Sequence, residues 1–446
     1  MGLIRVIVIL FCVLWSLPSV GQGFALPKHQ KHERVRFKLI NNLIIVPIEV
    51  NGAELSFVLD SGVGKPILFN LADQDSLQIN SVSEITLMGL GDGEPMKALK
   101  SRNNIVKLGN AVNWNQELYV VLDRNLNFSS SIGIPVHGII GYELFRDFVV
   151  ELNYSAQNVK FHNPELYVSQ DKKKSLTLPL DIVNRKAFIE GSVMLEESED
   201  IPVRLLVDTG SSDALWLFHD PAKGLDIPEK HYEDYLGKGL NGDIFGRRTK
   251  VNGIKIGRFE LHNAKAAFPY RESFNSVKNL GNRNGSVGGE ILKRFNMVFD
   301  YRNEKITLKT NNNFSEPFQY NLAGIELQHN GVRYIAERIA DSRGIVRNGK
   351  EADTFGNVQI LFQNRTRLSL VPEIIVSGIR AGSPAQEAGL KAGDVILAVN
   401  GKKVHNYKLQ EILKMLNEKE GKKVRVLIER YDRNLTFNFV LKNMFD

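Results

Sequence analysis

The sequence predicts a mainly β protein in which two similar lobes are followed by a smaller domain of strands and one helix. Two observations support the lobes. A short apolar run ending in an Asp-hydroxyl-Gly triplet occurs twice, and the segments behind the triplets match in spacing. A third observation supports the last domain: after residue 318 glycine-rich turns alternate with apolar runs and one amphipathic stretch. Short apolar runs between turn residues are typical of buried strands.

The repeated triplets are Asp-Ser-Gly at residues 60–62 and Asp-Thr-Gly at residues 208–210. Because an apolar run leads into each, each Asp stands at the end of a predicted buried strand. A carboxylate in such a place is costly to bury unless its charge is shared or hydrogen-bonded. Two copies in one chain therefore predict that the carboxyl groups of Asp60 and Asp208 meet at one site.

The segments behind the triplets repeat at nearly equal distances. Asp60 precedes Gly89 by 29 positions, and Asp208 precedes Gly237 by the same 29. An apolar-Gly motif ends at Gly141, 81 positions after Asp60, and a second one ends at Gly288, 80 positions after Asp208. Landmarks that recur in one order at such spacing indicate an internal duplication.

Two polar linkers divide the chain. We expect the first lobe at residues 35–162, the second at residues 175–310, and the last domain at residues 318–446. Within the last domain, residues 409–416 carry apolar side chains at helical spacing. Residues 340–370 follow no clear pattern, and we expect an insertion or a long loop there.

Length and composition agree with this organisation. The 446 residues are enough for about three domains, and 43% hydrophobic with 24% charged residues is ordinary for globular proteins. The net charge of +7 is spread along the chain, with tight basic runs only at residues 172–174 and 247–248. Nucleic acid is therefore not an expected partner.

Residues 1–21 have the pattern of a secretory signal. Arg5 provides the positive start, an apolar core follows, and small residues precede a predicted cut before Gln22. We expect an exported protein, in the periplasm, at the cell surface or secreted; the alternative is an uncleaved anchor. The one cysteine, Cys12, lies inside this segment. The mature chain would then have no disulfide, and we expect no metal and no cofactor.

Each lobe resembles one unit of the retropepsin-like aspartyl proteases, through its triplet, its glycine-rich turn and its apolar-Gly motif. The run at residues 208–212 is also similar to pepsin, and the last domain resembles a bacterial PDZ domain. The combination resembles exported bacterial aspartyl proteases with a C-terminal PDZ domain. It implies a bilobal aspartic-protease β-barrel pseudo-dimer followed by a PDZ-like α/β domain.

This resemblance implies that Asp60 and Asp208 are the catalytic residues. Two carboxyl groups a few ångströms apart cannot both ionise, so the pair shares one proton and can activate water for peptide hydrolysis. Which Asp holds the proton stays open. The resemblance also implies supporting residues in the triplet loops, namely Ser61, Gly62, Thr209 and Gly210. It implies flaps over the substrate at Gly89, Gly91, Gly93, Gly237 and Gly239.

In the PDZ-like domain an extended peptide is expected to add as a strand beside the helix at residues 409–416. We expect Leu409 and Leu413 to line that groove. Gly324 and Ile325 are the candidates for a carboxylate-binding loop, with Gly324 leaving backbone N–H groups free. The expected partners are peptide or protein substrates and a C-terminal peptide bound at this domain.

Three alternatives remain open from the residues alone. The chain is either an aspartic endopeptidase or a non-catalytic exported peptide-binding protein that keeps the protease groove and the PDZ domain. We expect a monomer closed within one chain, although each lobe could instead pair with another molecule. Residues 237–242 also match a dinucleotide-binding Gly-x-Gly-x-x-Gly, but no strand-helix-strand pattern surrounds them.

Overall fold

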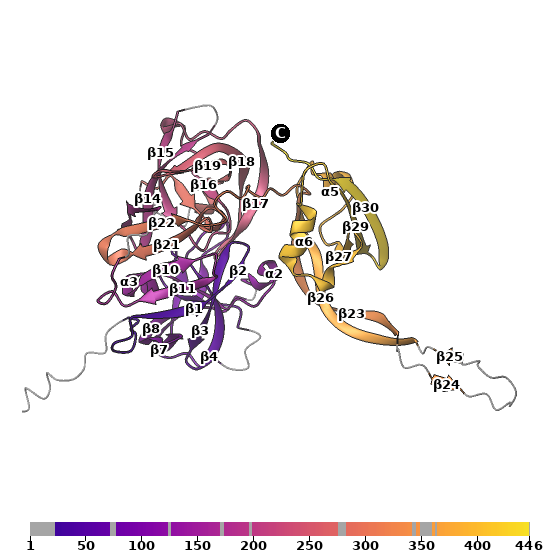
Figure 1. Ribbon diagram of the computed structural model, residues 1–446, viewed down its shortest axis with the longest axis horizontal. Coiled ribbons are helices and arrows are strands. Elements are labelled where there is room, and N and C mark those ends of the chain that lie inside the picture. The colour runs from indigo at the N-terminus through magenta and orange to yellow at the C-terminus, as the bar shows by residue number, and fades with distance from the viewer. Residues whose placement is uncertain are drawn as a thin grey trace, which may run out of the picture. The chain divides into compact units, whose positions relative to one another are not determined.

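The computed structural model describes residues 23–71, 77–123, 126–169, 174–195, 199–274, 282–340, 345–347, 359–361 and 364–445. The predicted signal at residues 1–21 lies outside the described residues. The described chain divides into two compact units, whose strands Figure 1 labels. The first takes the residues up to Ser129, Ile134–Tyr320 and the last residues from Met444; the second takes Ser130–Gly133 and Asn321–Asn443.

Each lobe of the first unit contains an eight-stranded sheet, and the two sheets have the same strand order. In the first lobe the order is β2 (Lys38–Ile40), β3 (Leu43–Val50), β4 (Ala53–Leu59), β9 (Gly138–Ile140), β5 (Ile67–Leu68), β8 (Ala111–Val121), β7 (Met96–Leu108) and β6 (Ser83–Leu87). In the second it is β13 (Asp181–Val183), β14 (Lys186–Met194), β15 (Ile201–Val207), β20 (Gly285–Val287), β16 (Leu215–Leu217), β19 (Phe259–Pro269), β18 (Gly242–Ile256) and β17 (His231–Gly239). The prediction of a mainly β, duplicated fold is confirmed.

Matching pairings place the triplets at matching positions. The strand before each triplet, β4 or β15, runs parallel to the strand of the apolar-Gly motif, β9 or β20. The last three residues of β4 and of β15 are apolar and all buried, so each strand is covered on both faces where it reaches its triplet. Two-residue turns at residues 41–42 and 184–185 have positive φ at both positions, which is the geometry of tight hairpins.

A third sheet joins the two lobes. Its six strands are ordered β1 (His32–Arg36), β11 (Asn158–His162), β10 (Val149–Asn153), β21 (Phe295–Asp300), β22 (Lys305–Thr310) and β12 (Ser175–Pro179). The join is the antiparallel pairing of β10 from the first lobe with β21 from the second. One hydrophobic core runs through both lobes, with Phe145 packed on Phe299 across the join. The two lobes therefore form one unit within one chain.

Helices are short and few among the described residues. The α-helices are α2 (Ser129–Ile132), α3 (Tyr142–Asp147), α4 (Gly289–Leu292), α5 (Pro384–Glu387) and α6 (Leu409–Leu416). The 3-10 helices are η1 (Pro221–Lys223), η2 (Arg271–Phe274), η3 (Tyr301–Asn303) and η4 (Val404–Asn406). In this part of the chain no helix has the length and apolar character needed to cross a membrane.

The second unit is a sheet flanked by α5 and α6. The order is β23 (Ile325–Ala340), β26 (Asn364–Ile379), β27 (Val395–Val399), β29 (Lys423–Arg430) and β30 (Arg433–Val440), with β28 (Lys402–Lys403) paired to β27. Strands β23 and β26 form a long hairpin. The stretch expected as an insertion or long loop contains the antiparallel pair β24 (Ile345–Arg347) and β25 (Gln359–Leu361).

The domain boundary near the end of the chain differs from the expected one. We expected them in the PDZ-like domain, but from Met444 onward they group with the first unit. The reason is the buried ring of Phe445, which stacks on Tyr232 at 5.3 Å and lies 5.5 Å from the ring of Tyr320. Burying an aromatic ring against other rings is more favourable than leaving it exposed to water.

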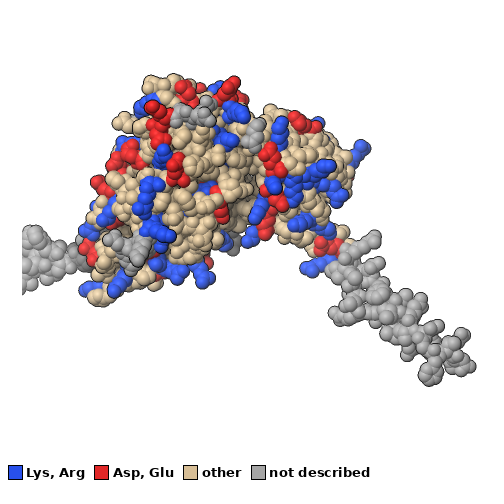
Figure 2. All heavy atoms as spheres, turned by 45° about the horizontal axis from the view of Figure 1, so that its top comes forward, with Lys and Arg blue, Asp and Glu red and all other residues tan. Residues whose placement is uncertain are grey.

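Basic and acidic side chains are interspersed on the face of the molecule that Figure 2 shows. No large region of one sign stands out on that face. A continuous basic surface is the electrostatic feature expected of nucleic-acid binders. This distribution agrees with the spread of charge along the sequence.

Candidate active site

The two triplets leave their strands in the same way. Asp60 follows β4 and donates its backbone N–H to Ile140 O in β9 at 2.8 Å. Asp208 follows β15 and donates its N–H to Val287 O in β20 at 3.0 Å. Because these parallel pairings are equivalent, each Asp is held at the end of its central strand with its side chain at the junction of the lobes.

Hydroxyl groups tie the two triplet loops together. Ser61 Oγ donates to Val207 O at 2.6 Å, and Thr209 Oγ1 donates to Leu59 O at 2.7 Å. Each hydroxyl also accepts the other residue's backbone N–H, at 3.0 and 3.2 Å. Both side chains are fully buried. Since every bond crosses from one lobe to the other, the loops are fixed face to face.

Glycine follows in each triplet, where a side chain would come close to the other lobe's carboxyl group and, at Gly210, would collide with it. A Cβ on Gly210 would lie 2.7 Å from Asp60 Oδ1 and nearer still to its Cγ. A Cβ on Gly62 would lie 3.3 Å from Asp208 Cγ. The glycine N–H groups donate to their own lobe's Asp Oδ1, at 2.7 Å in the first triplet and 3.0 Å in the second. The structure thus brings both carboxyl groups to one place.

The two carboxyl groups are coupled electrostatically. Protein surrounds both densely, although each keeps some accessible surface. Burial raises the pKa of Asp60, and the negative charge of Asp208 raises it further. Burial also raises the pKa of Asp208, but Arg283, the N–H of Gly210 and Lys186 oppose that rise. The two carboxyl groups interact with each other, and because Arg283 and Lys186 oppose the rise at Asp208, the environment favours the proton on Asp60 and the charge on Asp208.

Two glycine-rich hairpins meet tip to tip in the first unit. The tip between β6 and β7 holds Gly89, Gly91 and Gly93, and the tip between β17 and β18 holds Gly239 and Asn241. The N–H of Gly89 donates to Asn241 Oδ1, and Asn241 N donates to Leu90 O at 2.9 Å. A Cβ on Gly91 would lie 2.5 Å from the backbone of Asn241, and Gly239 is pressed against Leu90.

Gly237 has a different place from the other predicted flap residues. It lies inside β17, at a bulge where the register with β18 shifts, and a Cβ there would meet nothing within 4 Å. Its φ of +149° is what requires glycine. The Gly-x-Gly-x-x-Gly at residues 237–242 is thus a hairpin and opens no helix.

Asn241 is a residue that the sequence analysis did not single out. Its side chain is buried at the contact, accepting from Gly89 and donating through Nδ2 to Glu94 O at 2.6 Å. We expect Asn241→Ala to separate the tips. Amide hydrogen exchange at residues 88–94 should then become faster, whereas Asn252→Ala in the second half of β18 should leave it unchanged. Unchanged exchange in Asn241→Ala would contradict this role.

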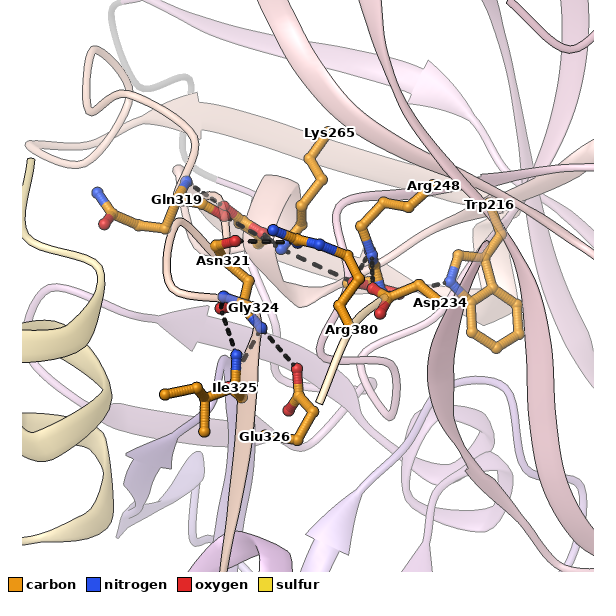
Figure 3. A network of polar contacts seen from close by, with 12 residues as sticks. Trp216, Asp234, Arg248, Lys265, Gln319, Asn321, Gly324, Ile325, Glu326 and Arg380 are labelled. Atoms are coloured by element: carbon orange, nitrogen blue, oxygen red, sulfur yellow. Dashed lines mark hydrogen bonds and ion pairs between the residues drawn. The ribbon is translucent and has the colours of Figure 1, made fainter. Parts of the chain in front are cut away.

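A buried ion network lies in the second lobe, and Figure 3 shows its members Trp216, Asp234 and Arg248. Arg248 pairs with Asp213 at 2.9 Å and with Asp234 in β17 at 2.6 Å, and Trp216 Nε1 donates to Asp213 at 2.7 Å. Burial alone would raise the pKa of Asp213, but Arg248 and Lys265 hold it below its usual range. The network connects the loop after the triplet to the hairpin β17–β18. Trp216 is accordingly a core residue.

In the second unit, the predicted carboxylate-binding residues are already engaged. Asn321 Oδ1 accepts the backbone N–H groups of Gly324 at 2.9 Å and Ile325 at 3.3 Å, also visible in Figure 3. The prediction that Gly324 leaves these donors free is therefore wrong. Glycine is needed there for a φ of +74° and because a Cβ would collide with Ser383.

The two groove candidates on α6 differ in exposure. Leu409 is buried in the core at 1% exposed, whereas Leu413 keeps partial exposure. Strand β23 forms one end of the sheet order, and α6 packs against it. An edge strand beside a helix is the arrangement to which an extended peptide can add.

A cavity of about 720 Å³ lies elsewhere in the first unit. Tyr142, Tyr301, Trp114 and residues 23–25 are among those that line it, and neither Asp of the triplets does. In the described parts of the chain, no group of three or more His, Cys, Asp and Glu is placed to hold a metal ion.

Comparison with known proteins agrees with the duplicated site. Residues 46–144 and 192–283 match the sequence model of the aspartyl protease family, and each match contains one triplet. Residues 375–430 match that of the PDZ domain. Among solved structures, an aspartic proteinase from Irpex lacteus is 14% identical, over 64% of this chain and 99% of its own length, with a TM-score of 0.38.

Proposed function

We propose that this chain, with its two aspartyl protease repeats and its PDZ domain, is an aspartic endopeptidase that hydrolyses peptide bonds. The observation that supports this most is the pair Asp60 and Asp208, whose carboxyl groups share a hydrogen bond at the junction of two loops tied by hydroxyl groups. A pair that shares one proton offers a base and an acid at one place, which is what hydrolysis by water requires.

The roles follow from the electrostatics of the pair. The ionised Asp208 takes a proton from a water molecule, which attacks the carbonyl carbon of the scissile peptide. The protonated Asp60 donates a hydrogen bond to the carbonyl oxygen as negative charge develops there. The tetrahedral intermediate then collapses as a carboxyl proton passes to the leaving nitrogen. The fixed triplet loops keep these groups in position without reorganisation.

The hairpin tips and the second unit would handle the substrate. Tips that meet through Asn241 must part to admit an extended peptide and can close again to exclude water. In the second unit, we propose that a partner or substrate segment adds to the edge of β23 beside α6. We also propose an exported monomer, on the basis of the signal pattern at residues 1–21 and of two lobes joined within one chain.

The experiment that tests the proposal is cleavage of denatured protein and of mixed peptides from about pH 3 to about pH 8. At low pH both carboxyl groups are protonated and the base is lost; at high pH both are ionised and the acid is lost. A bell-shaped profile is expected. Because burial raises the pKa of Asp60, its falling limb should lie above the ordinary carboxyl range. The statine-type inhibitor pepstatin should reduce cleavage. No turnover anywhere in the range would favour a peptide-binding protein instead.

A further inference from the structure

Two basic side chains of the second lobe flank the pair of Asp residues. Strand β14 pairs antiparallel with β15, and Phe188 lies opposite Leu206. If this register is continued by two residues, Lys186 lies opposite Asp208. Arg283 lies two residues before β20 and interacts electrostatically with Asp208, as Lys186 also does. Arg283 therefore lies near Asp208, and Lys186 lies near both members of the pair.

The first lobe has apolar residues at the equivalent positions. In β3 and β4, Ile45 faces Val58, so the register sets Leu43 beside Asp60. Gly138 at the start of β9 pairs with β4 in the same register as Gly285 at the start of β20 pairs with β15. Val136, two residues before Gly138, is therefore the first lobe's equivalent of Arg283. At these two pairs of equivalent positions the second lobe has cations and the first lobe has apolar side chains, a difference that the symmetry of the backbone does not require.

Arg283 is held in place by two contacts, and neither cation is neutralised. Arg283 Nε donates to Gly285 O at 2.8 Å, and its guanidinium lies 5.2 Å from the centre of the Phe218 ring. Both side chains are half-buried. Within the described residues, neither Lys186 nor Arg283 makes an ion pair within 4 Å. Burial lowers the pKa of each, and the charge of Arg283 further lowers that of Lys186.

Counting charge at the site shows a surplus. With one shared proton the two carboxyl groups carry a single negative charge, while the two cations together carry two positive charges. Half-buried charge without a partner is unfavourable, and an anion placed there would be stabilised by both cations. A bound peptide carries negative charge on its acidic side chains and on its terminal carboxylate. When the peptide is cleaved far from its end, only an acidic side chain can lie next to the site.

We propose that Lys186 and Arg283 form a subsite for an acidic side chain, so that the preferred substrates carry Asp or Glu next to the scissile bond on the side of the second lobe. This inference rests on the proposed peptidase function and names its substrate class. The aromatic ring of Phe218 holds the guanidinium of Arg283 from one side, which leaves its terminal donors for a carboxylate.

The test uses the full chain and pairs of quenched fluorescent peptides that differ only by Glu or Gln at one position near the scissile bond. We expect kcat/KM to favour the Glu peptide by about tenfold or more at one such position, as charge-assisted hydrogen bonds exceed neutral ones. Lys186→Leu, which reproduces the first lobe's Leu43, and Arg283→Gln should each reduce this ratio, and the double variant should bring it near one. Lys309→Met in β22 removes a distant charge and should leave the ratio unchanged.

Three outcomes separate the possibilities. Cleavage of Glu and Gln peptides at equal rates by the unaltered protein overturns the subsite while leaving the peptidase function standing. Cleavage of no peptide at all overturns the peptidase function itself. If the variants fold poorly, the unaltered protein still decides, because an ion-pair preference should weaken as salt rises from about 50 to about 500 mM, and a salt-independent ratio would contradict it.

Discussion

Asp208→Asn is expected to reduce peptide cleavage by at least about 10³-fold, because removing the base of a proton-transfer step forfeits a contribution of that order. An amide in its place cannot take a proton from water, yet it can still accept the N–H of Gly210 and occupy nearly the same volume. The fold should therefore persist. The measurement is kcat/KM on a peptide that the unaltered protein cleaves.

Stability measurements distinguish lost chemistry from lost structure. Burial and the neighbouring charge raise the pKa of Asp60 in the folded protein above its unfolded value. The stability that its protonation contributes is present at low pH and is lost as pH rises through the folded pKa. Asp208→Asn removes the like charge, so the variant should lose less stability between acidic and neutral pH than the unaltered protein does.

A matched change tests the specificity of the Asp208→Asn effect. Asp226→Asn, on the exposed surface of the same lobe, should keep full activity. Retained cleavage in Asp208→Asn would reject its role as base. A collapse of activity in both variants would point to a general effect of losing a carboxylate in this lobe.

Gly210→Ala is expected to cause the second largest loss, of about 10²-fold or more in cleavage, because a 1 Å displacement of a catalytic group has costs of that order. The new methyl group would need the space now held by the Asp60 carboxyl group, at 2.7 Å from its Oδ1. The short Asp side chain must turn away, and the hydrogen bond between the two carboxyl groups must break. Overpacking should also lower the free energy of unfolding by roughly 1–3 kcal/mol.

The two triplets are expected to respond unequally to this substitution. A Cβ at Gly62 would stand 3.3 Å from Asp208 Cγ, so Gly62→Ala needs only a small adjustment and should lose less activity than Gly210→Ala. Gly253→Ala in β18, where the nearest atom is 3.7 Å away, should behave like the unaltered protein. Equal activity of Gly210→Ala and Gly253→Ala in the peptide assay would show that the carboxyl groups are not positioned as described.

Sequence patterns were sufficient for the site's central pair. The apolar runs before Asp60 and Asp208, and the equal spacing behind them, are local and periodic features that a chain displays without its tertiary contacts. They led to two equivalent lobes, and the resemblance to aspartyl proteases implied the supporting hydroxyl and glycine residues of the triplets. Spacing along the chain does not reveal which side chains from distant segments converge. Asn241, Lys186 and Arg283 were therefore missed, each an ordinary polar residue in a hairpin or beside a strand.

The PDZ-like unit shows the same limit in another form. Gly324 and Ile325 were expected to form a loop with free N–H groups. Asn321 Oδ1, three residues before Gly324 and four before Ile325, accepts both, and residue spacing alone does not specify such a local side-chain contact. Likewise Leu409 and Leu413 have the same residue type on one helix, and packing alone buries the first and leaves the second partly exposed.

Sequence alone determined that this protein has a duplicated β fold with an acidic residue at the end of each repeat's central strand, because strand periodicity and repeat spacing are written along the chain. Tertiary structure decided how the repeats differ at their junction: the proton is favoured on Asp60 and the charge on Asp208, and Lys186 and Arg283 of the second lobe stand where the first lobe has Leu43 and Val136. The physical reason is that protonation and charge balance depend on burial and on neighbours that the chain brings together only by folding.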